Sequence, residues 1–256
     1  MNDTPLRVSL ERDGQLLKLE LARPKANIID AQMISALDKA LVEHLDSDSL
    51  KAVLLSAGGP HFSFGASVEE HLPDRCADML RSLHQLILRI FESSVPVMVA
   101  VRGQCLGGGL EVAAAGHMIF AAPDAKFGQP EIKLGVFAPA ASCLLPMRIG
   151  QVRAEDLLLS GRSIDAEEAL RFGLITSIDD DPEATALAYF AEHLAPLSAS
   201  SLSIALTAVR GGVQEEMHRR LGEVETLYLE KLMNTSDAVE GLTAFIARRS
   251  PVWKKG

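Results

Sequence analysis

The chain has 256 residues, of which 48% are apolar, and carries 25 basic and 34 acidic side chains. This length allows one large domain, or a core with a smaller appendage, that is stable without disulfides or metals. A net charge of −9 disfavours nucleic acid as the main partner, because nucleic-acid-binding surfaces are basic.

The predicted elements begin with a β-hairpin. Alternating apolar residues over 6–12 and 15–22 predict two strands, joined by a turn at Asp13-Gly14. Arg23-Pro24 ends the second strand. Asp30 then caps a predicted helix that continues to Leu45, because its apolar residues recur at helical spacing.

The middle of the chain alternates predicted strands and helices. A strand at 51–56 precedes a helix that spans 79–91. The uninterrupted apolar segment 96–101 is typical of a strand covered on both faces. After glycines 107–109 we expect a short helix, followed by a strand at 117–122.

The last third of the chain is expected to be largely helical. Asp165 and Glu168 have the spacing of a capping box, and Gly173 is a suitable stop for that helix. Helical patterns dominate from about residue 183 to 247. We therefore expect an α/β core over residues 1–195 and a C-terminal helical region over 196–256, without a long linker between them.

Export and membrane insertion are disfavoured. The first twenty residues mix charged and apolar side chains, unlike a signal peptide, and no apolar run approaches the ~18 residues that cross a bilayer. Cys76, Cys105 and Cys143 are odd in number and lack metal-ligand spacing, so neither a disulfide framework nor a zinc site is expected. These features predict a cytoplasmic protein.

Glu111 is the strongest candidate for a reactive residue. It lies in the apolar sequence Gly-Leu-Glu-Val-Ala-Ala-Ala, on the helix that follows a strand expected to be deeply buried. Burial disfavours the charged form of a carboxyl group and so raises its pKa toward neutrality. A carboxylate that faces solvent or pairs with an arginine is the alternative.

Gly107, Gly108 and Gly109 lie where that helix begins. Backbone N–H groups there are unobstructed, and the positive end of the helix dipole favours an anion. Gly108 precedes Glu111 by three residues, so an anion-stabilising amide and an acid–base group would lie one turn apart. A tight turn or close helix packing explains three glycines equally well, and the spacing is not that of a dinucleotide-binding loop.

Two other segments are weaker candidates. Glu131 follows Pro130 in Phe-Gly-Gln-Pro-Glu and alone is typical of a loop glutamate. Ser63 lies in His-Phe-Ser-Phe-Gly, close to the G-x-S-x-G pattern of nucleophilic serines, although His61 stands where that pattern needs a small residue. The seven histidines contain no pair at metal-ligand spacing, so no metal site is predicted.

Six motifs extend over nearly the whole chain. They are L-x-R-P-x-x-N at 21–27, F-S-F-G-A at 62–66, P-V-M-V-A-V-R-G-x-C-L-G-G-G-L-E at 96–111, F-G-Q-P-E-I-K-L-G at 127–135, S-G-R-S-I-D-A-E-E-A-L-R-F-G-L at 160–174 and R-R-S-P-V-W at 248–253. Their order and spacing resemble the crotonase superfamily, also called the enoyl-CoA hydratase/isomerase family. This resemblance implies an α/β spiral of ββα units with a helical C-terminal part.

The resemblance also implies a site for a coenzyme A (CoA) thioester. In this family two backbone N–H groups polarise the thioester carbonyl, and the matching positions are Ala66 and Gly108. Hydratases of the family use two glutamates, which match Glu111 and Glu131; the presence of both disfavours the dehalogenase, isomerase and decarboxylase branches. The family further implies a homotrimer or homohexamer, with no cofactor besides the CoA of the substrate.

Two segments depart from the usual family pattern. Ser67 follows Gly-Ala where an aspartate is usual, and residues 136–142 replace a glycine-rich segment and place Phe137 beside the expected acyl pocket. These segments resemble the cyclohexa-1,5-diene-1-carbonyl-CoA hydratase branch, which acts in anaerobic aromatic degradation. Lys25 and Ala26 correspond to the family's adenine-binding loop; the basic residues of 248–256 are interpreted either as CoA contacts or as a solvated tail.

The implied reaction is 1,4-addition of water to the cyclic diene, giving 6-hydroxycyclohex-1-ene-1-carbonyl-CoA. One glutamate would activate water at the β-carbon while the other supplies a proton, and only one of the two would be ionised at rest. Three alternatives stay open: a straight-chain enoyl-CoA hydratase of fatty-acid β-oxidation, a CoA thioester hydrolase that uses Ser63, and a CoA-binding protein without turnover.

Overall fold

The structure is a computed structural model that describes residues 4–254. Its main sheet pairs strands in the order β1-β2-β3-β4-β6-β9, in which β1 and β2 are antiparallel and the other neighbours are parallel. The strands are β1 (Leu6–Glu11), β2 (Leu16–Leu21), β3 (Ala52–Ala57), β4 (Val97–Val101), β6 (Met118–Ala121) and β9 (Ser177–Ile178). The predicted hairpin is confirmed, and Arg12, Asp13 and Gly14 make its turn with positive φ angles.

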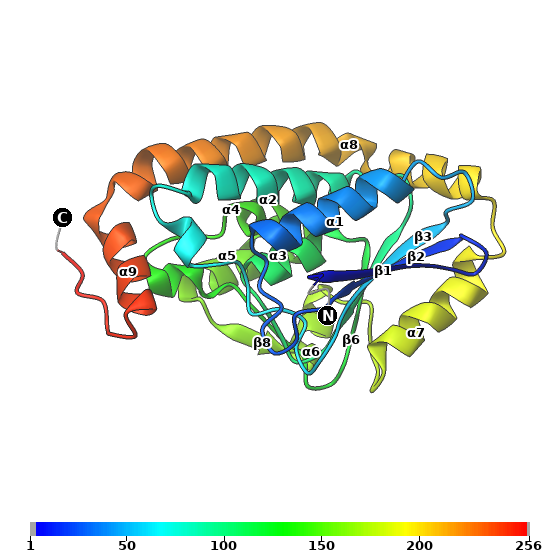
Figure 1. The fold of residues 1–256 in the computed structure, drawn as a ribbon, viewed down its shortest axis with the longest axis horizontal. Helices are drawn as coiled ribbons and strands as arrows, with labels where there is room; N and C mark the ends of the chain where they lie inside the picture. Colours follow the sequence, from blue (N-terminus) through cyan, green and yellow to red (C-terminus); the bar gives the residue numbers. More distant parts are fainter. Residues whose placement is uncertain (1–3, 255–256) are drawn as a thin grey trace.

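Helices cover both faces of this sheet (Figure 1). They are α1 (Ala31–His44), α2 (Cys76–Phe91), α3 (Gly108–Ala115), α4 (Pro139–Ile149), α5 (Gln151–Ser160), α6 (Ala166–Phe172), α7 (Pro182–Tyr189), α8 (Ala199–Thr226) and α9 (Ser236–Ile246). All five residues of β4 are buried, as its continuous apolar sequence predicts. Val97 and Val99 join the cluster under α1 and α2, whereas Met98 and Ala100 join the cluster that contains Phe190 after α7.

The predicted helix caps are confirmed. The Asp30 side chain accepts from the Met33 N–H at the start of α1, and Asp165 accepts from the Glu168 N–H at the start of α6. Gly173 ends α6 in the left-handed conformation. Each cap satisfies a backbone N–H or C=O that has no partner inside its helix.

A second, smaller sheet supports the glycine-rich turn before α3. It contains β5 (Gln104–Leu106), β7 (Lys126–Gly128) and β8 (Ser163–Asp165), three short strands that the sequence pattern does not predict. The 3₁₀ helices η1 (Glu69–His71) and η2 (Pro130–Leu134) flank this region. The Gly107 N–H donates to the Gly128 carbonyl at 2.9 Å, which joins the α3 turn to the end of β7.

The C-terminal part is helical, as expected. After β9 the described chain contains helices and loops, and the expected boundary at residue 195 falls between the π-helical segment Phe190–Leu194 and α8. Figure 1 shows α8 lying along α2, and the chain then passes through α9 at one end of the molecule. No helix in residues 4–254 is both long and apolar enough to cross a membrane.

Candidate active site

Glu111 lies inside the protein, on a helix whose eight residues are all buried. Its side chain is 3% exposed, and its Oε1 atom accepts a hydrogen bond from the Ala141 N–H at 2.9 Å. Ala141 belongs to the first turn of α4, where unpaired N–H groups and the helix dipole stabilise a negative charge. The unusual sequence at 136–142 thus begins the helix that binds the Glu111 carboxylate.

The local backbone and the close approach of Gly107 fix the position of the Glu131 side chain. It lies on η2, which begins at Pro130 and ends at Gly135 in the left-handed conformation. A Cβ atom on Gly107 would come within 2.6 Å of Glu131 Oε1, so a larger residue there would displace this carboxyl group. With the Gln129 amide turned so that its nitrogen faces Glu131, it donates to both carboxyl oxygens at 3.1 and 3.0 Å.

The two glutamates differ in their electrostatic surroundings. Burial, followed by the negative charge of Glu111, raises the pKa of Glu131 to about 8. Burial also raises the pKa of Glu111, but the N–H groups of Ala141 and Ala140 and the charge of His84 oppose this effect. These effects favour a protonated Glu131 beside an ionised Glu111.

The structure brings Ala66 and Gly108 together from different segments. A Cβ atom on Gly108 would lie 3.1 Å from the Ala66 nitrogen, so the two backbones approach closely. In the described chain neither the Ala66 nor the Gly108 N–H donates to another backbone carbonyl or to a side chain. Gly65 and Gly107, which precede them, have φ angles of 109° and 51° that turn the chain at these points. Two unpaired amides side by side are suited to an oxyanion.

A cavity of about 360 Å³ is lined by Ala66 and Glu131, whereas Gly108 and Glu111 lie outside its lining. Gly107 also lines it, and His71 and Lys133 are its other polar residues. The rest of the lining is mostly apolar and includes Phe64, Val68, Leu134, Val136, Leu242 and Phe245. Leu242 and Phe245 come from α9, so the C-terminal helices complete the cavity. Its size and lining suit an apolar ligand with one polar end.

Comparison with known proteins identifies the family. Residues 11–256 match the profile described as enoyl-CoA hydratase/isomerase. The chain belongs to this family. It is 64% identical to a cyclohexa-1,5-dienecarbonyl-CoA hydratase of Thauera aromatica, over 98% of this chain and 97% of the relative. It is 32% identical to a carnitinyl-CoA dehydratase of Salmonella typhi, over 96% of this chain and 97% of that protein.

Solved structures of the family share the fold. An enoyl-CoA hydratase from Bacillus halodurans superposes with a TM-score of 0.86 at 25% identity, over 94% of this chain and 99% of that one. An enoyl-CoA hydratase/isomerase from Pseudoalteromonas atlantica T6c gives a TM-score of 0.83 at 30% identity, over 98% of this chain and 100% of that one. The expected fold of this enoyl-CoA hydratase/isomerase family member is therefore confirmed.

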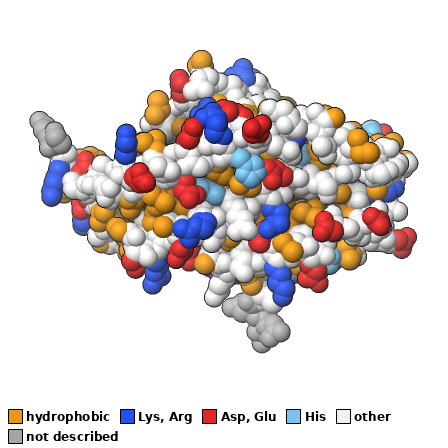
Figure 2. All heavy atoms as spheres, turned by 90° about the horizontal axis from the view of Figure 1, so that it is seen from above, with side chains coloured by type: hydrophobic (Ala, Val, Ile, Leu, Met, Phe, Trp, Pro, Cys, Tyr) orange, Lys and Arg blue, Asp and Glu red, His pale blue; other side chains and the backbone are white. Residues whose placement is uncertain are grey.

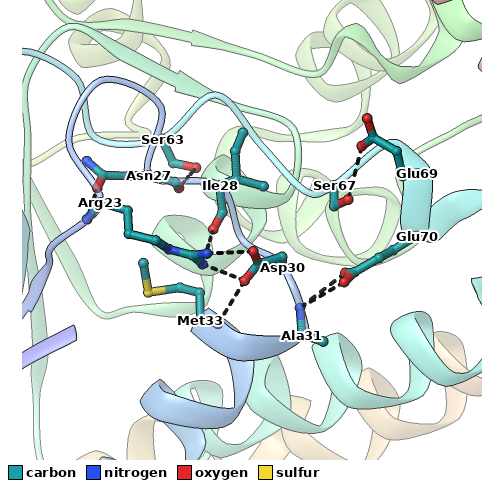
Figure 3. A network of polar contacts seen from close by, with 10 residues as sticks. All are labelled: Arg23, Asn27, Ile28, Asp30, Ala31, Met33, Ser63, Ser67, Glu69 and Glu70. Carbon is teal, nitrogen blue, oxygen red and sulfur yellow. Dashed lines mark hydrogen bonds and ion pairs between the residues drawn. The ribbon is translucent and has the colours of Figure 1, made fainter. Parts of the chain in front are cut away.

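The residues expected to bind substrate lie outside the cavity lining. Lys25 is exposed, with a φ angle of 90°, and the Ala26 carbonyl accepts from the Phe64 N–H at 2.9 Å. Figure 3 shows the loop that carries them, fixed by the Arg23–Asp30 ion pair. Ala26 thus contacts Phe64, which lines the cavity, but neither Lys25 nor Ala26 lines it.

Ser67 and Phe137 also lie beside the cavity rather than in its lining. The Ser67 hydroxyl points to Glu69, to which it donates at 3.3 Å (Figure 3), and its carbonyl contacts His71 Nδ1 at 2.7 Å. The Phe137 ring packs against Tyr228, with ring centroids 5.2 Å apart. The structure therefore joins Phe137 to Tyr228, which the sequence analysis did not single out.

The thioester hydrolase alternative based on Ser63 is wrong. Ser63 is fully buried, and its hydroxyl donates to the Asn27 carbonyl at 2.8 Å (Figure 3). The same hydroxyl accepts from the Gly65 N–H at 3.1 Å. His61 cannot act as its base, because His61 Nδ1 accepts from the Gln104 N–H. A nucleophile needs a free hydroxyl and an adjacent base. Ser63 instead positions the backbone at Gly65.

Other site residues carried no recognisable signal in the sequence. Gln129 lies within the motif that contains Glu131 but has no distinctive spacing of its own. His84 and Tyr228 contact Glu225 and Phe137, which are distant in the sequence, and nothing in their local sequence distinguishes them from core residues. Among residues 4–254, no group of three or more histidine, cysteine or acidic side chains is placed to hold a metal ion.

Proposed function

We propose that the protein is a hydratase that adds water to cyclohexa-1,5-diene-1-carbonyl-CoA and forms 6-hydroxycyclohex-1-ene-1-carbonyl-CoA. The observation that carries this proposal is the 64% identity, over nearly the full length of both chains, to a hydratase named for that substrate. The paired carboxyl groups, the two free amides and the mostly apolar cavity support it.

The reaction begins with the thioester carbonyl at the amides of Ala66 and Gly108. These two donors stabilise the negative charge that develops on the carbonyl oxygen as water attacks. Glu111, as carboxylate, takes a proton from water while the water oxygen bonds to the β-carbon. Glu131, as carboxylic acid, gives its proton to the far carbon of the diene, and the remaining double bond forms between them. Solvent exchange then returns both glutamates to their starting states.

A six-membered ring suits a site in which one carboxyl group activates water and another protonates a distant carbon. In a 1,4-addition the carbon that gains oxygen and the carbon that gains hydrogen lie across the ring from each other. The ring fixes their separation, so two carboxyl groups held at fixed positions can reach both carbons without ordering a flexible chain.

The direct test compares two substrates. Purified protein is incubated with cyclohexa-1,5-diene-1-carbonyl-CoA or with crotonyl-CoA, and products are followed by mass for the gain of one water. We expect kcat/KM to be at least ~10-fold higher for the cyclic diene, the low end of what apolar pocket contacts supply. A higher value for crotonyl-CoA would identify a straight-chain enoyl-CoA hydratase. Absence of product from both substrates would contradict hydratase activity.

The proposal extends to the cellular role. It places the enzyme in the anaerobic degradation of aromatic compounds in the cytoplasm, as a homo-oligomer. The reaction as written moves protons and forms one C–O bond, so it requires no redox cofactor and no metal-activated water. Measurement of activity after treatment with a chelator is the corresponding test, with unchanged turnover expected.

A further inference from the structure

Tyr228 has a buried hydroxyl group that the fold leaves unpaired. It lies in the π-helical segment Leu227–Lys231 that follows α8, and its side chain is fully buried. Its ring packs against Phe137 in an edge-to-face arrangement, with centroids 5.2 Å apart. Within residues 4–254 its hydroxyl oxygen has no hydrogen-bond partner. Burying an unsatisfied hydroxyl costs folding free energy, so its retention needs an explanation.

The ring contact places Tyr228 beside the candidate site, because Phe137 follows Val136 of the cavity lining and precedes the turn of α4 whose Ala141 N–H binds Glu111. Burial and the nearby groups Cys76, Glu131 and Glu111 raise the pKa of Tyr228. Both glutamates of the candidate site are thus among the groups that act electrostatically on the Tyr228 hydroxyl. A phenol with a raised pKa stays neutral at physiological pH, so Tyr228 acts as an O–H donor and not as a base.

The reacting part of the proposed substrate offers only two oxygen atoms. The thioester oxygen is assigned to the amides of Ala66 and Gly108, which come together at another part of the site. The second is the oxygen of the water that adds, which must lie at the carboxyl groups. The ring itself has carbon and hydrogen only. A donor beside Glu111 and Glu131 therefore matches the water oxygen.

We propose that Tyr228 is a catalytic residue whose O–H donates a hydrogen bond to the oxygen of the adding water, and to the same oxygen in the hydroxylated product. This role rests on the proposed hydratase function. It leaves one lone pair of the water free to attack the β-carbon while Glu111 takes one of its protons. Tyr228 keeps its own proton throughout.

Tyr228→Phe tests the role, because it removes one oxygen and preserves the ring contact with Phe137. We expect kcat/KM to fall at least ~10-fold, as for loss of one transition-state hydrogen bond. The Tm should equal or exceed that of the wild type, since an unsatisfied buried group is gone. Tyr189→Phe is the matched control: Tyr189, the other tyrosine of the chain, packs on Phe120 and His193 and should change neither quantity.

Ligand binding provides a second readout that does not need turnover. The Kd of 6-hydroxycyclohex-1-ene-1-carbonyl-CoA is compared with that of cyclohex-1-ene-1-carbonyl-CoA, which lacks only the hydroxyl. Tyr228→Phe should weaken binding of the first ligand by ~10-fold and leave the second unchanged.

The outcomes separate this role from a structural one. The role of Tyr228 is overturned if Tyr228→Phe keeps activity within about twofold of the wild type, or if it weakens the binding of both ligands equally. A lowered Tm also overturns it, because it would show that the hydroxyl has a hydrogen-bond partner within the fold. Failure of the wild type to hydrate the cyclic diene contradicts the proposed function instead. The variant is then compared with the wild type on whichever enoyl-CoA the wild type hydrates.

Discussion

Glu111 and Glu131 carry the same functional group in two different settings. Backbone N–H groups from the start of α4 and the charge of His84 favour the ionised form of Glu111. Glu131 is half-buried, and its partial burial together with the negative charge of Glu111 favours its protonated form. The negative charge of Glu111 helps to keep Glu131 protonated. The pair therefore holds one proton that Glu131 can give and one carboxylate, Glu111, that can accept a proton.

Glu111→Gln and Glu131→Gln should each lower kcat by at least ~10²-fold while leaving CoA-ester binding largely intact. The amide has nearly the same shape as the carboxyl group but neither takes nor gives a proton, so the loss falls on acid–base catalysis. Steady-state kinetics and a binding titration measure the two effects. Near-normal turnover by either variant would contradict the paired-carboxyl mechanism.

The raised pKa of Glu131 predicts how activity depends on pH. Glu131 acts as the acid only when protonated, so kcat/KM should fall as pH rises through about 8. A kcat/KM profile measured across this region checks the prediction. If the residual activity of Glu131→Gln still falls at the same alkaline pH, the fall is caused by a group other than Glu131.

The same pKa predicts a change in stability. The folded-state pKa of Glu131 is raised above the ordinary value of 4.5, so its favourable contribution is full below that value and is lost as pH rises through about 8. Glu131→Gln carries no such penalty. Its Tm, relative to the wild type, should therefore be higher at about pH 9 than at about pH 5, as measured by thermal unfolding; a constant difference would contradict a raised pKa.

At the level of elements, the backbone conformation at the start of α3 determines where the Glu131 side chain can lie. Gly107 caps this helix with a φ angle of 51° and lies against Glu131. Gly107→Ala should therefore combine backbone strain with displacement of the acid, and lower kcat/KM at least ~10-fold. Gly150→Ala is the matched control, because Gly150 has a φ angle of 81° and a Cβ atom there would meet no other group within 4 Å. It should lower Tm without changing activity; equal activity losses would refute the steric explanation.

Two histidine–glutamate pairs join α2 to α8 across a cleft of about 480 Å³. His84 Nδ1 lies 2.5 Å from Glu225 Oε2 and is buried, whereas His218 pairs with Glu92 at the exposed side. Figure 2 shows pale blue histidine side chains near the middle of this face, among acidic and basic neighbours. Of these four side chains, His84 is the one that lowers the pKa of Glu111.

Removal of His84 should therefore change the pH dependence of catalysis. His84→Gln removes the imidazole that lowers the pKa of Glu111, so this pKa rises and the acidic limb of kcat/KM moves to higher pH. His218→Gln breaks the other pair on the same helices and should leave that limb in place. Identical profiles for both variants and the wild type would show that His84 does not act on Glu111.

The sequence predicted those elements whose determinants are local. The hairpin depends on its turn residues, α1 on the Asp30 side chain, and β4 on one apolar run. The strands β5, β7 and β8 have three residues each and depend on their pairing partners, so no local pattern indicates them. Helix α4 contains Pro146 and is apolar on most sides, which hides its helical period.

The same distinction applies to the site. Glu111, Glu131, Ala66 and Gly108 lie in motifs and could be named from the sequence. The partner of His84 lies 141 residues away along the chain, a distance at which one sequence shows no pairing. Tyr228 likewise meets Phe137 only after the C-terminal helices pack on the core.

At the scale of the whole molecule, a net charge of −9 must coexist with a ligand that carries several phosphate charges. The tail expected to supply basic residues is partly neutralised, because Arg249 pairs with Glu240. Lys255 lies outside the described residues. Lys133 borders the cavity and is the basic residue best placed near a bound thioester.

The long helix α8 leads to the last prediction. It has 28 residues, yet only Met217 and Leu221 are buried, while Ile204 and Val209 are 70% and 79% exposed. Exposed apolar side chains on a helix that also completes the fold are typical of a subunit contact. We therefore expect a homo-oligomer at micromolar concentration in sedimentation equilibrium, and the resemblance to the family implies a trimer or a hexamer of two trimers. Val209→Glu should shift the distribution toward smaller species, whereas Val8→Glu on the edge strand β1 should not. A wild-type monomer at that concentration would contradict the prediction.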